Sequence, residues 1–130
     1  MAKYTKLFET KHVGQKRVTI AGSFTTVNGS DPTVTTGQGF TVARDGEGDW
    51  SITLSNELNA IDAVLLSVAP KTNTSASVVM EDVDARTATN ISLTLEQTAD
   101  SSSTDFAPAD DPGSIISFLV YGRDTNVDDL

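Results

Sequence analysis

Apolar residues recur at every second position in several short runs of the chain, which is the period of a β-strand with one buried face. In the clearest run, 50–55, Trp50, Ile52 and Leu54 alternate with small polar residues. Each such run predicts a strand, and Trp50 is expected in the core because it opens the most regular run. The predicted strands are 17–27, 40–44, 50–55, 63–69, 77–83, 90–97 and 114–121.

The segments between these runs are rich in turn residues. Residues 44–49 contain two glycines, which supply the positive φ of tight loops, and they predict a hairpin between the strands on either side. Residues 85–89 connect two further strands, and 56–61 is the only helix-like piece, too short for more than one turn. About seven or eight short strands joined by turns predict an all-β, antiparallel β-sandwich of jelly-roll or immunoglobulin-like order.

Two of the predicted strands, 63–69 and 114–121, are apolar on both faces. In a two-layer sandwich one face of each strand is expected to contact water. A second apolar face therefore predicts a contact with another subunit, which we place at Ile116, Phe118 and Val120. The alternative is that the N-terminal segment or a long loop of the same chain covers this face.

One long irregular loop, 98–113, separates the last two predicted strands. It is rich in Ser, Asp and Pro and contains a single aromatic residue, Phe106. Loops of this length in a compact domain are usually functional or disordered. Phe106 is therefore a candidate contact with a binding partner.

Charge is distributed unevenly along the 130 residues. Residues 1–17 carry five basic side chains and one acidic side chain, whereas 18–130 carry four basic and seventeen acidic side chains, and the net charge is −9. We interpret 1–17 as a basic arm, 18–125 as the sandwich domain and 126–130 as an acidic tail. The arm is either a solvated, frayed terminus or a segment that docks on an acidic neighbour. Its candidate partner-binding residues are Lys3, Lys6, Lys11, Lys16 and Arg17.

Composition excludes several classes of protein. The chain has no cysteine, so disulfides and thiolate metal sites are excluded. It has no run of about 18 apolar residues, so no membrane span is expected. Its first residues are basic but lack the apolar stretch of a secretory signal. The acidic body disfavours nucleic acid as a partner.

Catalytic chemistry has few candidates in this sequence. His12 is the only histidine, and positive neighbours in the basic arm disfavour its charged form. The chain has no Gly-x-Ser-x-Gly nucleophile motif and no phosphate-binding loop. The acidic groups at 45–49, 82–84 and 110–111 do not have EF-hand spacing and are expected to be solvated turns. We therefore expect no enzyme activity, metal, cofactor or small-molecule substrate.

A longer pattern appears where the hairpin and the later strands are considered together. Residues 37–56 read GQGFTVARDGEGDWSITLSN, a two-faced apolar strand follows, and 116–125 close with ISFLVYGRDT. This pattern resembles small β-sandwich structural proteins of tailed bacteriophages, over about residues 37–125. The resemblance implies a virion component, often trimeric, that binds other structural proteins, and it brings no catalytic residues.

Two roles are compatible with such a protein. Aromatic residues make up only 6% of the chain, which leaves few for a receptor-binding site and favours the head decoration, or cement, type. We therefore expect a capsid decoration protein on the exterior of the virion that binds the major capsid protein and forms a homotrimer. The alternatives are a tail-fibre or appendage module and a carbohydrate-binding β-sandwich.

Overall fold

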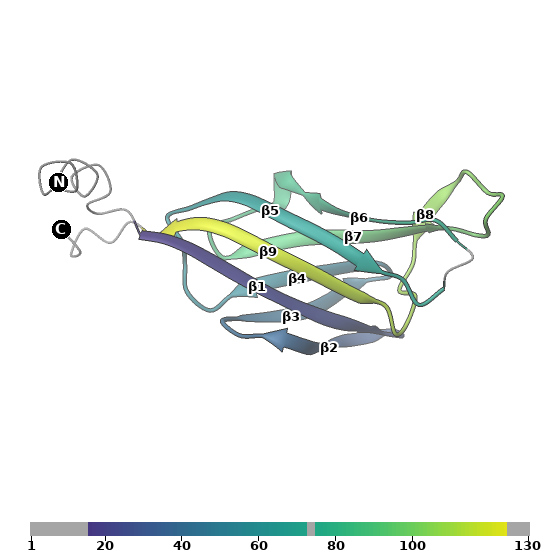
Figure 1. Cartoon of the computed structure of the whole chain (residues 1–130), viewed down its shortest axis with the longest axis horizontal. Coiled ribbons are helices and arrows are strands. Elements are labelled where there is room, and N and C mark those ends of the chain that lie inside the picture. Colours follow the sequence, from purple (N-terminus) through teal and green to yellow (C-terminus); the bar gives the residue numbers. More distant parts are fainter. Residues whose placement is uncertain (1–15, 73–74, 125–130) are drawn as a thin grey trace, which may run out of the picture.

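The computed structural model describes residues 16–72 and 75–124, which form two antiparallel β-sheets packed face to face (Figure 1). Sheet A has four strands in the order β2-β1-β9-β5. Their bounds are β1 Lys16–Val27, β2 Ser30–Gly37, β5 Ala60–Ala69 and β9 Ile115–Asp124. The predicted antiparallel β-sandwich is thus confirmed.

Sheet B has five strands, four of them in the order β3-β4-β7-β6. The short strand β8 pairs with residues 96–98 of β7, beyond the residues of β7 that pair with β4. A one-turn 3-10 helix, η1, follows β6. The bounds are β3 Phe40–Gly46, β4 Asp49–Leu54, β6 Ser77–Asp82, η1 Val83–Ala85, β7 Asn90–Thr98 and β8 Phe106–Pro108.

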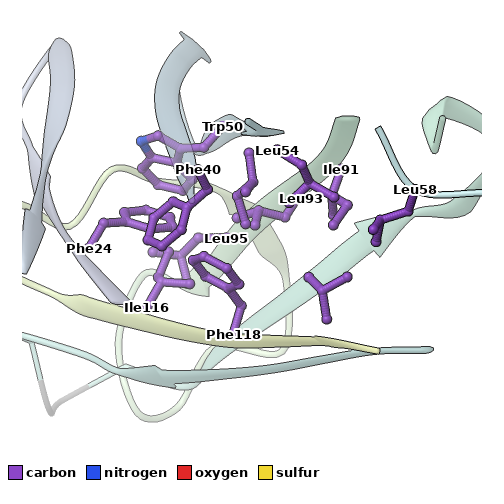
Figure 2. Close-up of a cluster of buried hydrophobic side chains, with 12 residues drawn as sticks. Phe24, Phe40, Trp50, Leu54, Leu58, Ile91, Leu93, Leu95, Ile116 and Phe118 are labelled. Carbon is purple, nitrogen blue, oxygen red and sulfur yellow. The ribbon is translucent and has the colours of Figure 1, made fainter. Parts of the chain in front are cut away.

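The core lies between the sheets and is formed by the alternating apolar positions of their strands. Trp50 is fully buried, as predicted, and its ring lies 5.9 Å from that of Phe24 in the opposite sheet. Phe40 and Phe118 make an edge-to-face pair with ring centroids 4.7 Å apart (Figure 2). Each fully buried large apolar side chain stabilises the fold by about 1.5–3 kcal/mol. The core residues are Phe24, Phe40, Trp50, Ile52, Leu54, Leu58, Ile91, Leu93, Leu95, Ile116, Phe118 and Val120.

Most of the predicted local structure is confirmed. β3 and β4 form the expected hairpin, and β6 and β7 are antiparallel neighbours joined through 83–89. Three predictions are wrong. Residues 56–61 form no helical turn, the strands β2 and β8 are not among the predicted ones, and β1 begins at Lys16, which was assigned to the arm.

The first and last strands, β1 and β9, are neighbours in the middle of sheet A, paired from Lys16–Asp124 to Thr25–Ile115. In the immunoglobulin order the first strand lies at the edge of its sheet. The observed order is therefore not immunoglobulin-like. The start of β1 and the end of β9 lie at one end of the sandwich, and β8 lies near the other (Figure 1).

Candidate protein-interaction surface

The outer face of sheet A carries a set of side chains without charge. Strands β1, β9 and β5 contribute one residue each to four successive rungs of the sheet. We call these residues the neutral face: Thr19, Tyr121 and Ala63; Ala21, Leu119 and Leu65; Ser23, Ser117 and Ser67; Thr25, Ile115 and Ala69. Three large apolar members are well exposed, Leu65 at 58%, Tyr121 at 45% and Ile115 at 40%.

Two hydroxyl-bearing members of the neutral face, Ser23 and Thr25, bond to hydroxyl groups of the neighbouring strand β2. Ser23 Oγ lies 2.8 Å from Thr36 Oγ1 of β2, and Thr25 Oγ1 lies 2.8 Å from Thr35 Oγ1. A hollow of about 270 Å³ lies between β5 and β9 on this face, with Leu65, Ser67, Ser117 and Leu119 among its lining residues. A surface of small hydroxyls and exposed aliphatic groups suits contact with another protein surface.

Three charged side chains lie at the end of the neutral face where β1 begins. Asp62 lies at a register shift in β5 and accepts hydrogen bonds from Arg123 Nε at 3.2 and 3.1 Å. Arg17 Nη1 lies 3.6 Å from the same carboxylate, but the Arg17 side chain is 67% exposed. Exposed ion pairs of this kind contribute little to stability. This end of the neutral face is therefore bordered by the guanidinium groups of Arg17 and Arg123 and by the carboxylate of Asp62.

The outer face of sheet B, unlike the neutral face, carries acidic side chains. Asp49 and Asp82 lie on its cross-strand rungs, as does Glu96 opposite Val78 and Pro108. Asp45 accepts a hydrogen bond from the Ser51 hydroxyl on the same face. These rungs include no lysine or arginine. The sandwich therefore has one neutral face and one acidic face.

The adjacent carboxylates of Asp110 and Asp111, considered from the sequence as an acidic turn, have a structural role. Asp110 accepts hydrogen bonds from the Gly48 amide at 2.9 Å, the Gly29 amide at 3.2 Å and Arg44 Nε at 3.1 Å. Burial alone opposes its ionisation, but the hydrogen bonds from Arg44, Gly48 and Gly29 outweigh burial and lower the pKa of Asp110.

Asp111 binds a second set of donors. Its carboxylate accepts from the Ser114 and Thr72 hydroxyls, both at 2.7 Å, from the Gln97 amide at 2.7 Å and from the Lys71 backbone amide at 3.1 Å. Burial again opposes ionisation, and the hydrogen bonds, led by that of Ser114, lower the pKa of Asp111. Both carboxylates therefore tie the β8–β9 loop to neighbouring loops.

Metal-ligating side chains are not clustered in the described part of the chain. Within residues 16–72 and 75–124, no group of three or more His, Asp or Glu side chains is placed to hold a metal ion. His12 lies outside the described residues. Two further hollows of the described residues, of about 420 and 300 Å³, share Leu58 in their linings and contain one carboxylate each, Glu57 and Asp124. None of the described helices is long and apolar enough to cross a membrane.

The predicted subunit contact at Ile116, Phe118 and Val120 is wrong. These side chains are at most 4% exposed and face sheet B across the core. The opposite face of β9, with Ile115 and Tyr121, is the exposed one. A signal was present in the sequence, because the outer positions include Ser117 and Arg123, whereas the core positions between 116 and 120 are uniformly apolar.

Some of the predicted partner-binding residues lie outside the described residues, and the others lie in different parts of the sandwich. Lys3, Lys6 and Lys11 lie outside the described residues, and Lys16 begins β1. Arg17 borders the neutral face. Phe106 is 46% exposed on β8, in the other sheet, so it does not join Arg17 in one surface. The exposed candidates that the sequence patterns did not indicate are Leu65, Ile115 and Tyr121.

Comparisons with protein-family models, with curated proteins and with solved structures found no match to this chain. The case for function therefore depends on the neutral face and on the sequence pattern.

Proposed function

We propose that this chain is a non-enzymatic structural protein that attaches to another protein through the neutral face of sheet A. The observation that carries the proposal is an uncharged, partly apolar sheet face on a molecule whose other sheet is acidic outside. Contiguous exposed apolar surface on a folded domain commonly marks a protein contact. The successive rungs of mostly small side chains suit a broad surface rather than a small ligand.

The resemblance to bacteriophage structural proteins supports a particular partner. We propose a capsid decoration protein on the virion exterior, with the major capsid protein as its partner and self-association as a second contact. The basic arm, with five basic residues against one acidic residue, complements an acidic shell surface. The pairing of a neutral face with a basic arm fits attachment across a seam between shell subunits.

The carbohydrate-binding and appendage alternatives receive less support. Sugar sites use exposed aromatic rings, and the exposed aromatic residues of the described chain, Tyr121 and Phe106, belong to different sheets. The hollow between β5 and β9 is lined by aliphatic and hydroxyl groups together with Phe118, whose ring packs in the core.

The proposal is tested by producing the chain together with the major capsid protein encoded in the same genome. The chain should sediment with assembled shells. Tyr121→Asp should weaken this attachment by about tenfold or more, because it would bury an unpaired charge in the contact. The matched control Ala43→Asp adds the same charge to the exposed acidic face of β3 and should leave attachment intact.

Two results would contradict the proposal. One is a chain that never sediments with shells. The other is equal attachment by the native chain and the Tyr121→Asp variant, which would show that the neutral face is not the contact. Binding of the chain to a glycan array in place of shells would favour the carbohydrate-binding alternative.

A further inference from the structure

The two four-strand paths of the sandwich end in four edge strands, β2, β5, β3 and β6. Proteins usually protect such edges against pairing with another chain through charges, proline, bulges or short length. β2 contains Asp31 and Pro32, and its pairing with β1 has two register shifts. β3 contains Arg44 and Asp45 next to a register shift. β6 has only six residues and ends in two acidic ones. Three of the four edges are therefore protected.

The fourth edge, β5, is protected only at its start. Asp62 lies at the register shift between Ile61 and Ala63, and Arg86 Nη1 donates to the Ile61 carbonyl at 3.4 Å. From there, 63–69 runs in unbroken register along β9 and reads Ala-Val-Leu-Leu-Ser-Val-Ala, without charge, proline or glycine. No strand of the described residues pairs with the other side of β5.

The side chains of β5 are incompletely covered on both faces of the sheet. Val64, Leu66 and Val68 pack against the core but remain partly exposed, whereas the β9 residues opposite them are at most 4% exposed. On the outer face, Leu65 is the most exposed large apolar side chain of sheet A, at 58%. A strand added beside β5 would cover apolar surface on both faces.

We infer that residues 63–69 of β5 pair with the same segment of a second copy of this chain, as antiparallel strands related by a two-fold axis. A strand that fits this edge must be uncharged and apolar on both faces, and 63–69 itself has that character. The symmetric register that pairs all seven residues centres on Leu66. It places Val64 opposite Val68 of the second copy and joins the two four-stranded sheets into one.

Charge favours this edge over the acidic face of sheet B as a contact between two copies. The acidic outer faces of sheet B repel each other between copies, whereas 63–69 brings no charges together. Two-fold strand pairing is a closed, isologous contact and gives a dimer. A trimer, the state that the sequence resemblance implies, would need a different contact. This inference deepens the proposed self-association and rests on that part of the proposed function.

The first test compares the sedimentation of the native chain with that of Leu65→Lys/Ser67→Lys. In the proposed register, position 65 lies opposite position 67 of the second copy, so the variant places like charges across the seam. We expect the native chain to sediment as a dimer. In the variant, the dissociation constant of the dimer should be higher by about tenfold or more. The variant reduces the net negative charge, so general repulsion cannot cause this loss.

A matched control is available on another edge strand. Thr41→Lys/Ala43→Lys places two lysines with the same spacing on the exposed face of β3 and should leave the dimer unchanged. All four positions are solvent-exposed, so both variants should fold. Unfolding curves for each variant check this expectation.

The second test locates the seam by cross-linking, since the native chain has no cysteine. Residues directly opposite in an antiparallel pair have Cα atoms about 4.5–5.5 Å apart, which is within disulfide range. Leu66→Cys should therefore form a disulfide-linked dimer on mild oxidation, and Thr53→Cys on the acidic face should not.

A native chain that stays monomeric, or that forms a trimer, would overturn the inference. So would a Leu65→Lys/Ser67→Lys variant that dimerises as well as the native chain, or loss of the dimer in Tyr121→Asp, which would indicate face-to-face contact. These outcomes are separate from shell binding. A monomeric chain that still sediments with capsids would retain the proposed attachment and remove the β5 pairing.

Discussion

At the scale of single residues, Gly22 is the described glycine that leaves the least room for a side chain. A Cβ atom added to Gly22 of β1 would lie 2.3 Å from Phe40 Cζ and 3.1 Å from Phe118 Cζ. The ring of Phe40 therefore occupies the space that a side chain at position 22 would take. Because position 22 has no side chain, the Phe40 ring of sheet B and the Phe118 ring of sheet A can pack against each other beside β1.

Gly22→Ala should destabilise the protein by about 1–3 kcal/mol, because overpacking forces the Phe40 ring out of its preferred position. Denaturant unfolding would measure the loss. In the double variant Gly22→Ala/Phe40→Leu the ring is removed, so the combined loss should be smaller than the sum of the two single losses. Strict additivity would show that the two positions do not interact.

The sequence predicts core residues correctly in a strand with one apolar face, but not in a strand with two. Trp50, Ile52 and Leu54 were predicted as buried because their polar neighbours fix the face of the strand. Ile116 and its neighbours were assigned to the wrong face, because both faces of that strand are apolar and only Ser117 distinguishes them. Burial in such a strand depends on which sheet lies opposite, which is a long-range property.

At the scale of elements, the loop between β8 and β9 depends on two ionised carboxylates. Asp110 ties the loop to the β1–β2 turn through Gly29 and to the β3–β4 hairpin through Gly48 and Arg44. Asp111 ties it to Thr72 and Gln97. The non-glycine residue Asp111 adopts a positive φ of 40°, which is usually unfavourable and is held here by these bonds.

The lowered pKa values of Asp110 and Asp111 predict a dependence of stability on pH. Because their folded-state pKa lies below the unfolded value of about 3.9, their contribution is present above that value and is lost as pH falls through the folded pKa. Asp110→Asn should cost about 3 kcal/mol at neutral pH, because it leaves the partly buried Arg44 without its charge partner.

The same substitution should also reduce the loss of stability on acidification below about pH 4, since one of the titrating groups is gone. Denaturant unfolding across this pH range would measure both effects. Asp105→Asn, at an exposed position of the preceding β7–β8 loop, is the control and should behave like the native chain. Equal acid sensitivity of Asp110→Asn and the native chain would contradict this role.

The elements missed from the sequence are those with weak patterns. β2 is almost entirely exposed and contains Pro32, and its β-branched residues 33–36 show no alternation of apolar and polar positions. β8 has three residues, all exposed, inside a loop rich in Ser and Asp. Both strands are held by neighbouring strands rather than by their own sequence, and a local pattern cannot show such support.

At the scale of the whole molecule, charge separates the chain into regions with different roles. The sequence made the basic arm visible, because the imbalance lies within a single stretch of chain. The neutral and acidic faces were not visible, because each is assembled from three or four strands distant in sequence. Of the candidate site, the sequence therefore predicted the arm and a second apolar face, but not which face or edge is exposed.

The arm supplies the last prediction. If residues 1–17 dock on an acidic shell, replacing Lys3, Lys6 and Lys11 by Gln in the full-length chain should weaken attachment and reduce its dependence on salt. The native chain should detach progressively as ionic strength rises, because screening weakens contacts between exposed charges. The melting temperature should stay unchanged, since these positions precede the first strand.

Lys71→Gln is the control for this experiment, because Lys71 is the only lysine outside the arm and its described hydrogen bonds come from its backbone amide. Attachment should survive in this variant at every salt concentration. If the triple variant attaches as well as the native chain, the arm is a solvated terminus and the neutral face alone must account for binding. If Lys71→Gln weakens attachment equally, the effect reflects net charge, and the docking role of the arm is refuted.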